Sequence, residues 1–122
     1  MNHIAWLFIG TGLLIMVSAV PLIRRKIPMN KWIGVRFRSS FRSDSLWYDI
    51  NEYGGWALVI ASLSVVITGV VGLCVWPFAK SPAYPLMASA ALTFYYLVAA
   101  VMTYRYGLRR ERQEDSRDDL DS

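Results

Sequence analysis

The sequence contains few of the side chains from which catalytic and metal sites are built. Its 122 residues include one cysteine, Cys74, and one histidine, His3. A single cysteine excludes an intramolecular disulfide and a multi-cysteine metal site, and a lone histidine near the terminus has no companion ligands. The chain also lacks a glycine-rich phosphate loop, a Gly-x-Ser-x-Gly motif and an H-E-x-x-H motif. We therefore predict that the protein is not an enzyme and has no catalytic residue, cofactor, metal or nucleic-acid partner.

Charged residues are absent from three long windows. Residues 4–23, 56–76 and 86–104 contain no Asp, Glu, Lys, Arg or His. A helix rises about 1.5 Å per residue, so each window is long enough to cross a hydrocarbon core about 30 Å thick. A soluble domain of this length has no need of three apolar helices without a charged face. The first window also lacks the basic n-region of a signal peptide. The sequence therefore predicts an all-α integral membrane bundle of three transmembrane helices.

The windows lack ionisable groups but carry stripes of small and hydroxyl side chains. Proton relays and ion pathways usually need a charge at membrane depth, so the sequence argues against a pump or an ion-coupled transporter. Small and hydroxyl residues are common in membrane helices, and they also mark where such helices pack. Two stripes at helical spacing predict that the second and third spans form an antiparallel hairpin: Ala57, Ala61, Ser64, Thr68 and Gly72, and Ser89, Thr93, Tyr96, Ala100 and Thr103. The contact points expected on the first span are Gly10, Thr11 and Ser18.

Basic residues are unevenly distributed outside the windows. Twelve of the thirteen Lys and Arg residues lie in segment 24–55 or after Tyr104, and the other is Lys80, between the second and third windows. Lys and Arg concentrate in the short loops that stay in the cytoplasm. The sequence therefore predicts a multi-pass protein with its N-terminus outside and its C-terminus in the cytoplasm. An odd number of spans independently requires the two ends to lie on opposite sides.

Segment 24–55, between the first two spans, combines basic, aromatic and turn-forming residues. Each basic side chain near an anionic leaflet contributes about 1 kcal/mol to membrane binding. The residues placed to bind phosphate, in lipid headgroups or in another anion, are Arg36, Arg38 and Arg42.

The later part of this segment has the pattern of a helix. Ser43 or Asp44 is suited to cap it, and apolar residues then recur at helical spacing. We predict a short interfacial amphipathic helix over residues 43–52, followed by a turn at Gly54 and Gly55. The alternative is a helix that runs straight through both glycines.

Two runs in this segment, IPMNKWIGVR and SDSLWYDINEYGGW, resemble the signature of the SdpI family. These are bacterial membrane proteins named for the immunity and signalling protein of a peptide-toxin system. The family pattern resembles Pro-x-Asn-x-x-x-Gly-[Ile/Val]-Arg, a Thr-rich link, and Trp-x-x-x-Asn-x-x-x-Gly. Where the family often has threonine, this chain has Phe37, Ser39 and Ser40. The positions that fall on the pattern are Pro28, Asn30, Gly34, Val35, Arg36, Trp47, Asn51 and Gly55.

The resemblance covers most of the chain and corresponds to the C-terminal three-helix module of larger members. It implies a protein of the bacterial cytoplasmic (inner) membrane that confers immunity to a membrane-active peptide toxin, or signals by binding a cytosolic regulator. The alternative is a structural or accessory subunit of a larger membrane complex. The expected partners are membrane lipids, a peptide toxin or a cytosolic regulator, and further subunits in a homo- or hetero-oligomer.

The motif supplies the candidate binding residues, which are Pro28, Asn30, Gly34, Arg36, Trp47, Asn51 and Gly55. Trp47 and Asn51 are four residues apart and share one helix face. We hypothesise that Arg36 and Asn30 fold back onto that face or onto loop carbonyls, and so form a rigid polar cap on the bundle. Three roles remain open at this point: a purely structural one, binding of a protein or peptide, and binding of lipid headgroups.

The chain thus divides into a membrane domain and a tail. The domain covers residues 1–108, with spans at about 4–23, 56–76 and 86–104 and the motif loop at 24–55. The tail, residues 109–122, is basic in its first half and acidic in its second. Such a segment is usually solvated, either disordered or as a frayed helix extension.

Overall fold

The structure, a computed structural model, describes residues 3–75 and 80–122. This part of the chain contains three long α-helices, one short 3-10 helix and no β-strand. The elements are α1 (His3–Ile23), η1 (Ser39–Phe41), α2 (Asp44–Cys74) and α4 (Ala83–Asp121). All three α-helices are long and apolar enough to cross a membrane. The prediction of an all-α bundle with three membrane-spanning helices is confirmed.

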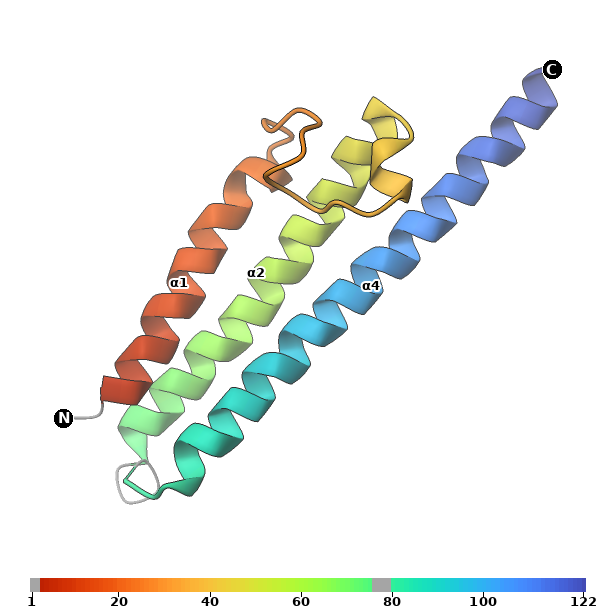
Figure 1. The fold of residues 1–122 in the computed structure, drawn as a ribbon. Coiled ribbons are helices and arrows are strands. Elements are labelled where there is room, and N and C mark those ends of the chain that lie inside the picture. The colour runs from red at the N-terminus through yellow and green to blue at the C-terminus, as the bar shows by residue number, and fades with distance from the viewer. Residues whose placement is uncertain (1–2, 76–79) are drawn as a thin grey trace.

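The central helix is α2, with α1 along one side and α4 along the other (Figure 1). The segment that joins α1 to α2, residues 24–43, lies across one end of the bundle; we call it the connecting loop and this end the loop end. The start of α1 and the start of α4 lie at the opposite end (Figure 1). The predicted span 56–76 ends outside the described residues, since α2 ends at Cys74.

Small residues bring α1 and α2 into backbone contact. A Cβ atom on Gly12 would lie 2.6 Å from a methyl group of Val66 and 2.9 Å from the carbonyl oxygen of Ser62. On the facing helix, a Cβ on Gly69 would lie 2.8 Å from the carbonyl oxygen of Ala5. Such close approach provides packing energy where lipid removes the hydrophobic drive for association. The buried small residues repeat every seven positions, as Ala5, Gly12 and Ala19 on α1 and Gly55, Ser62 and Gly69 on α2.

The contact points predicted on the first span are wrong. Gly10, Thr11 and Ser18 are all exposed, and a Cβ on Gly10 would meet nothing within 4 Å. The Ser18 hydroxyl donates instead to the carbonyl of Leu14 on its own helix. Each residue turns a helix by about 100°, so an error of one or two positions selects a different face.

The predicted hairpin of the second and third spans is confirmed. The hydroxyls of Ser62 and Tyr96 lie 3.0 Å apart, and the Tyr84 hydroxyl donates to the carbonyl of Thr68 at 3.2 Å. Thr103 is also buried at this interface, beside Gly54. The predicted stripe on the third span is right only in part, because Ser89, Thr93 and Ala100 are exposed.

The separate interfacial helix predicted over residues 43–52 is not present. Ser43 caps α2, since its hydroxyl accepts from the N–H of Leu46 at 3.1 Å, and the helix then continues through both glycines to Cys74. Gly54 and Gly55 remain helical because they are packing positions. A Cβ on Gly54 would lie 2.7 Å from Val35, and one on Gly55 would lie 2.7 Å from Ile23. These glycines allow close approach rather than a turn.

The charged tail is a continuation of α4, which remains helical to Asp121. Of the two forms expected for this segment, the helix extension is the one observed. It carries α4 past the loop end of the bundle (Figure 1). Its first turns therefore run beside the connecting loop, where they supply contacts described below.

Candidate functional site

The connecting loop is attached to α2 through Trp47. This side chain is fully buried, and its indole N–H donates to the carbonyl of Ile27 at 2.9 Å. The ring of Phe41 packs against it with the ring centres 5.5 Å apart. A buried indole needs a partner for its N–H, so this hydrogen bond fixes the first part of the loop on the helix.

Asn51, one turn further along α2, holds the middle of the loop. Its side-chain oxygen accepts from the N–H of Val35 at 2.6 Å, and its amide donates to the carbonyls of Trp47 at 2.9 Å and Val35 at 3.4 Å. The side chain is 2% exposed. A buried amide that satisfies a loop N–H and C=O replaces the hydrogen bonds that a sheet or helix would provide.

Gly34 allows this contact because it has no side chain. Its φ angle is +110°, a conformation that other residues rarely adopt. A Cβ here would lie 2.5 Å from the side-chain oxygen of Asn51 and 3.2 Å from the ring of Trp47. The spacing of Gly34, Trp47 and Asn51 in the motif therefore describes one packing unit.

Asn30 and Arg36 bind the backbone of the loop itself. The Asn30 side-chain oxygen accepts from the N–H groups of Trp32 and Ile33 at 2.8 and 2.7 Å. Its amide donates to the carbonyl of Pro28 at 2.8 Å. The Arg36 guanidinium donates to the carbonyl of Lys31. Of the partners hypothesised from sequence, the loop carbonyls are the ones that these two side chains contact.

The last motif residue, Gly55, faces α1 rather than the loop. A Cβ on it would lie 3.3 Å from the carbonyl oxygen of Ala19. Five of the seven candidates therefore order the loop: Asn30, Gly34, Arg36, Trp47 and Asn51. The carbonyl of Pro28 accepts a hydrogen bond from Asn30, and Gly55 allows α1 and α2 to approach closely. Whether any of them also touches a partner stays a prediction.

Ion pairs join the three helices at the loop end. Asp49 of α2 binds Arg25, just after α1, at 2.9 Å and also accepts from Arg110 of α4. Arg25 binds Glu52 as well, at 2.9 Å. The Arg25 guanidinium donates hydrogen bonds to the carboxylates of Glu52 and Asp49, and these raise its pKa above the ordinary value. Sequence reasoning missed Asp49, because its partners are 24 and 61 residues away.

A second set of contacts ties the loop to α4. Arg42 binds Glu111 at 2.8 Å and Asp115 at 2.9 Å, and its pKa is raised mainly by hydrogen bonding to Asp115. The Ser39 hydroxyl donates to Glu111 at 2.6 Å. Arg42 thus has carboxylate partners within the chain and is not the free phosphate-binding group expected from sequence. The sequence does show a basic loop and acidic residues near the C-terminus. Which arginine pairs with which acid, however, can be seen only in the folded structure.

Comparison with known proteins identifies the family. The model of the SdpI/YfhL protein family matches residues 26–107. The chain belongs to this family. No curated protein and no solved structure matches it. The matched SdpI region contains all seven candidate residues together with Asp49, whereas Glu111 and Asp115 follow it.

The connecting loop of this SdpI protein has two exposed apolar side chains. Trp32 is 83% exposed and Ile33 is 58% exposed, although their N–H groups are both held by Asn30. Lys31 beside them is exposed too. We call Lys31, Trp32 and Ile33 the loop tip. Over residues 3–75 and 80–122, no group of three or more His, Cys, Asp or Glu side chains is placed to hold a metal ion. The loop tip thus places two exposed apolar side chains on an ordered backbone.

Proposed function

We propose that this SdpI-type membrane protein is not an enzyme and acts by binding a partner through its loop tip. The partner is a membrane-active peptide toxin, against which the protein gives immunity, or a cytosolic regulator that it holds at the membrane. We place the protein in a bacterial cytoplasmic membrane.

One observation carries the proposal: an ordered loop that leaves a tryptophan exposed. Ordering an apolar tip in advance reduces the entropy lost on binding, and tryptophan is enriched among residues that dominate binding energy. The hydrogen bonds of Asn30 and Asn51 supply that order. Large exposed side chains along the helices face lipid, but those of the loop tip follow the end of α1 and lie outside all three predicted spans.

The distribution of Lys and Arg supports an orientation with the N-terminus outside and the C-terminus in the cytoplasm. With the loop and the C-terminus on the cytoplasmic side, twelve of the thirteen Lys and Arg residues lie inside. A phosphatase reporter fused after Arg42 should therefore be inactive, and the same reporter fused near Lys80 should be active, because phosphatase folds only outside the cytoplasm. The reverse pattern would overturn this orientation and leave a toxin as the only partner of the loop.

Replacing Trp32 by alanine tests the binding role. We expect normal protein levels and membrane insertion, because the side chain is exposed, but loss of function. A deletion strain would be complemented with the wild type or with Trp32→Ala and challenged with a peptide that dissipates the membrane potential. Survival with Trp32→Ala should fall to that of the deletion strain.

The control is Trp6→Ala, which removes an equally large exposed ring from α1. It should protect as the wild type does. A photo-crosslinking residue at position 31, which is exposed in the loop tip and leaves Trp32 in place, should give a discrete adduct in cells, and the same residue at position 10 should not. Full protection by Trp32→Ala without any adduct would refute the proposal. Stable isolation with a large membrane complex through the helices would support an accessory subunit instead.

A further inference from the structure

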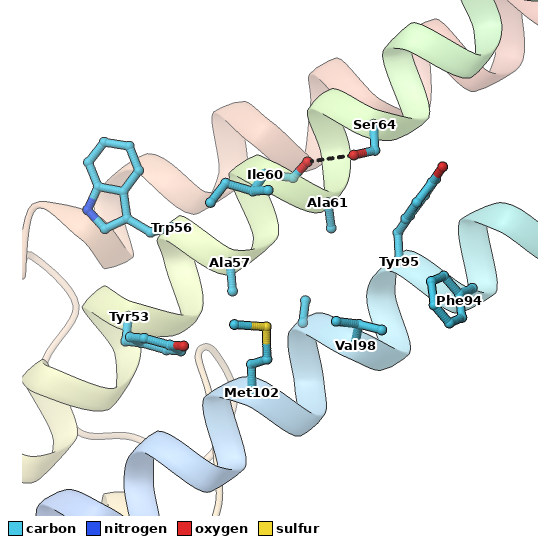
Figure 2. A pocket seen from close by; sticks show the side chains of 11 residues that line it. Tyr53, Trp56, Ala57, Ile60, Ala61, Ser64, Phe94, Tyr95, Val98 and Met102 are labelled. Carbon is cyan, nitrogen blue, oxygen red and sulfur yellow. Dashed lines mark hydrogen bonds between the residues drawn. The ribbon is translucent and has the colours of Figure 1, made fainter.

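An apolar groove lies between α2 and α4, on the side of α2 away from α1. Its volume is about 300 Å³, at the lower end of the roughly 300–1,000 Å³ of small-molecule pockets. Figure 2 shows Met102 and Val98 of α4 facing Ala57 and Ala61 of α2 across it. The hydroxyl of Ser64 in the groove wall donates to the carbonyl of Ile60, so it is already satisfied. The groove therefore offers apolar contact and little hydrogen bonding.

The groove ends at two stacked tyrosines. The rings of Tyr53 and Tyr106 are parallel, with their centres 4.2 Å apart, and Tyr53 also lines the groove. Beyond them stands the ion pair of Asp49 and Arg110. Tyrosine prefers the level of the lipid headgroups, where its ring is dry and its hydroxyl is wet. The loop end of the groove therefore lies where acyl chains meet headgroups.

Two arginines continue the groove face of α4 at the level of the tyrosines and the ion pair, since Arg105 directly precedes Tyr106 and Arg109 directly precedes Arg110. Arg105 is three residues and Arg109 seven residues after Met102, spacings that keep all three on one side of a helix. Measured along the helix axis from Met102, the rise is about 4.5 Å to Arg105 and about 10.5 Å to Arg109. Both side chains are exposed, and neither bonds to a residue that the structure describes. The nearby acids are already paired, since Asp49 and Glu52 bind Arg25 and Arg110.

We propose that the groove binds one anionic phospholipid, with an acyl chain between α2 and α4 and the phosphate held by Arg105 and Arg109. The apolar groove matches the chain, and two unpaired guanidinium groups match a doubly coordinated phosphate. The ion-paired group of Asp49, Glu52, Arg25 and Arg110 adds no net charge, because it contains two acids and two bases. A zwitterionic lipid would fill the same groove but bring its own cation to the arginines, so the site favours an anionic headgroup.

Native mass spectrometry of the full chain, released from phosphatidylcholine nanodiscs that contain phosphatidylglycerol, tests the site. We expect one phosphatidylglycerol retained per protein. In Arg105→Ala/Arg109→Ala its preference over phosphatidylcholine should fall about thirtyfold, if each arginine contributes about fivefold. The matched control, Arg112→Ala/Arg117→Ala, removes the same charge further along α4 and should retain the lipid. An equal loss in both pairs would show only surface attraction and would overturn the proposal.

A second variant tests the groove itself. Ala57→Phe places a ring in the groove and should release the lipid, whereas Leu63→Phe, at an exposed position that does not line the groove, should not. Retention of phosphatidylglycerol in Ala57→Phe would exclude the groove as the place of the acyl chain. A dimer without bound lipid in the wild type, abolished by Ala57→Phe, would mean that a second copy of the chain occupies the groove. Either result would overturn the proposal.

Discussion

Replacement of Gly12 by leucine should separate α1 from α2. Even a methyl group at this position would meet a methyl group of Val66 at 2.6 Å and the backbone oxygen of Ser62 at 2.9 Å. A side chain that is too large for a packed interface typically costs about 1–3 kcal/mol. Here the obstacle includes backbone, which cannot move aside as a side-chain end can, so we expect a loss at the upper end of this range.

The matched control lies two residues earlier on the same helix. Gly10→Leu adds the same side chain at a position where a Cβ meets nothing within 4 Å, and it should leave stability unchanged. Titration with a denaturing detergent, followed by tryptophan fluorescence, measures both variants. Gly69→Leu, on the α2 side of the interface, should match Gly12→Leu, because its Cβ would lie 2.8 Å from the Ala5 carbonyl oxygen. Equal stability of the Gly10 and Gly12 variants would contradict this packing.

Replacement of Asn51 by alanine should release the connecting loop while the membrane helices stay folded. The change leaves the N–H of Val35, now bonded at 2.6 Å, without its partner. A buried donor without a partner costs about 1–3 kcal/mol, and because this contact is only partly buried we expect about 1.4 kcal/mol, which is tenfold in an equilibrium constant. Trypsin should therefore cut after Lys31, Arg36 or Arg38 about tenfold faster or more in Asn51→Ala than in the wild type.

Two further variants make this measurement specific. Gly34→Ala should have a similar effect from the other side of the contact, because its Cβ would displace the Asn51 side chain. Ser45→Ala changes an exposed residue of the same helix and should be cut like the wild type. If Asn51→Ala and Ser45→Ala are cleaved at the same rate, the loop does not depend on Asn51. Because α1 and α2 touch elsewhere, the detergent midpoint of Asn51→Ala should change much less than that of Gly12→Leu.

Some roles of the motif residues can be predicted from neighbouring residues in the sequence, and others cannot. Pro28, Asn30 and Gly34 are typical turn formers, so a compact loop was foreseeable from their chemistry. The role of Trp47 as a hydrogen-bond donor to Ile27 was not, since the two are 20 residues apart. Gly54 and Gly55 are compatible with a turn or with a helix that runs straight through, and the packing against Val35 and Ile23 keeps both in α2. Tertiary packing thus outweighed propensity.

The seven-residue repeat of small residues between α1 and α2 is present in the sequence, but the sequence does not distinguish it from other small residues on the same helices. Gly10 and Thr11 are as small or polar as Gly12, and no charged face sets the rotation of a helix that is apolar all round. Arg42 shows the same limit for charges. Its partners Glu111 and Asp115 follow it by 69 and 73 residues, so composition alone left it as a candidate phosphate ligand.

Three features could be predicted from the sequence alone: three helices long and apolar enough to cross a membrane, a hairpin of the second and third, and an SdpI motif between the first two. These are local properties: a long segment without charge satisfies its own backbone hydrogen bonds as a helix and partitions into lipid. The folded structure was needed to show which face of α1 meets α2, that α2 is continuous, and which charges pair at the loop end. Those outcomes depend on the relative rotation of whole helices and on residues far apart in the chain, which no local pattern specifies.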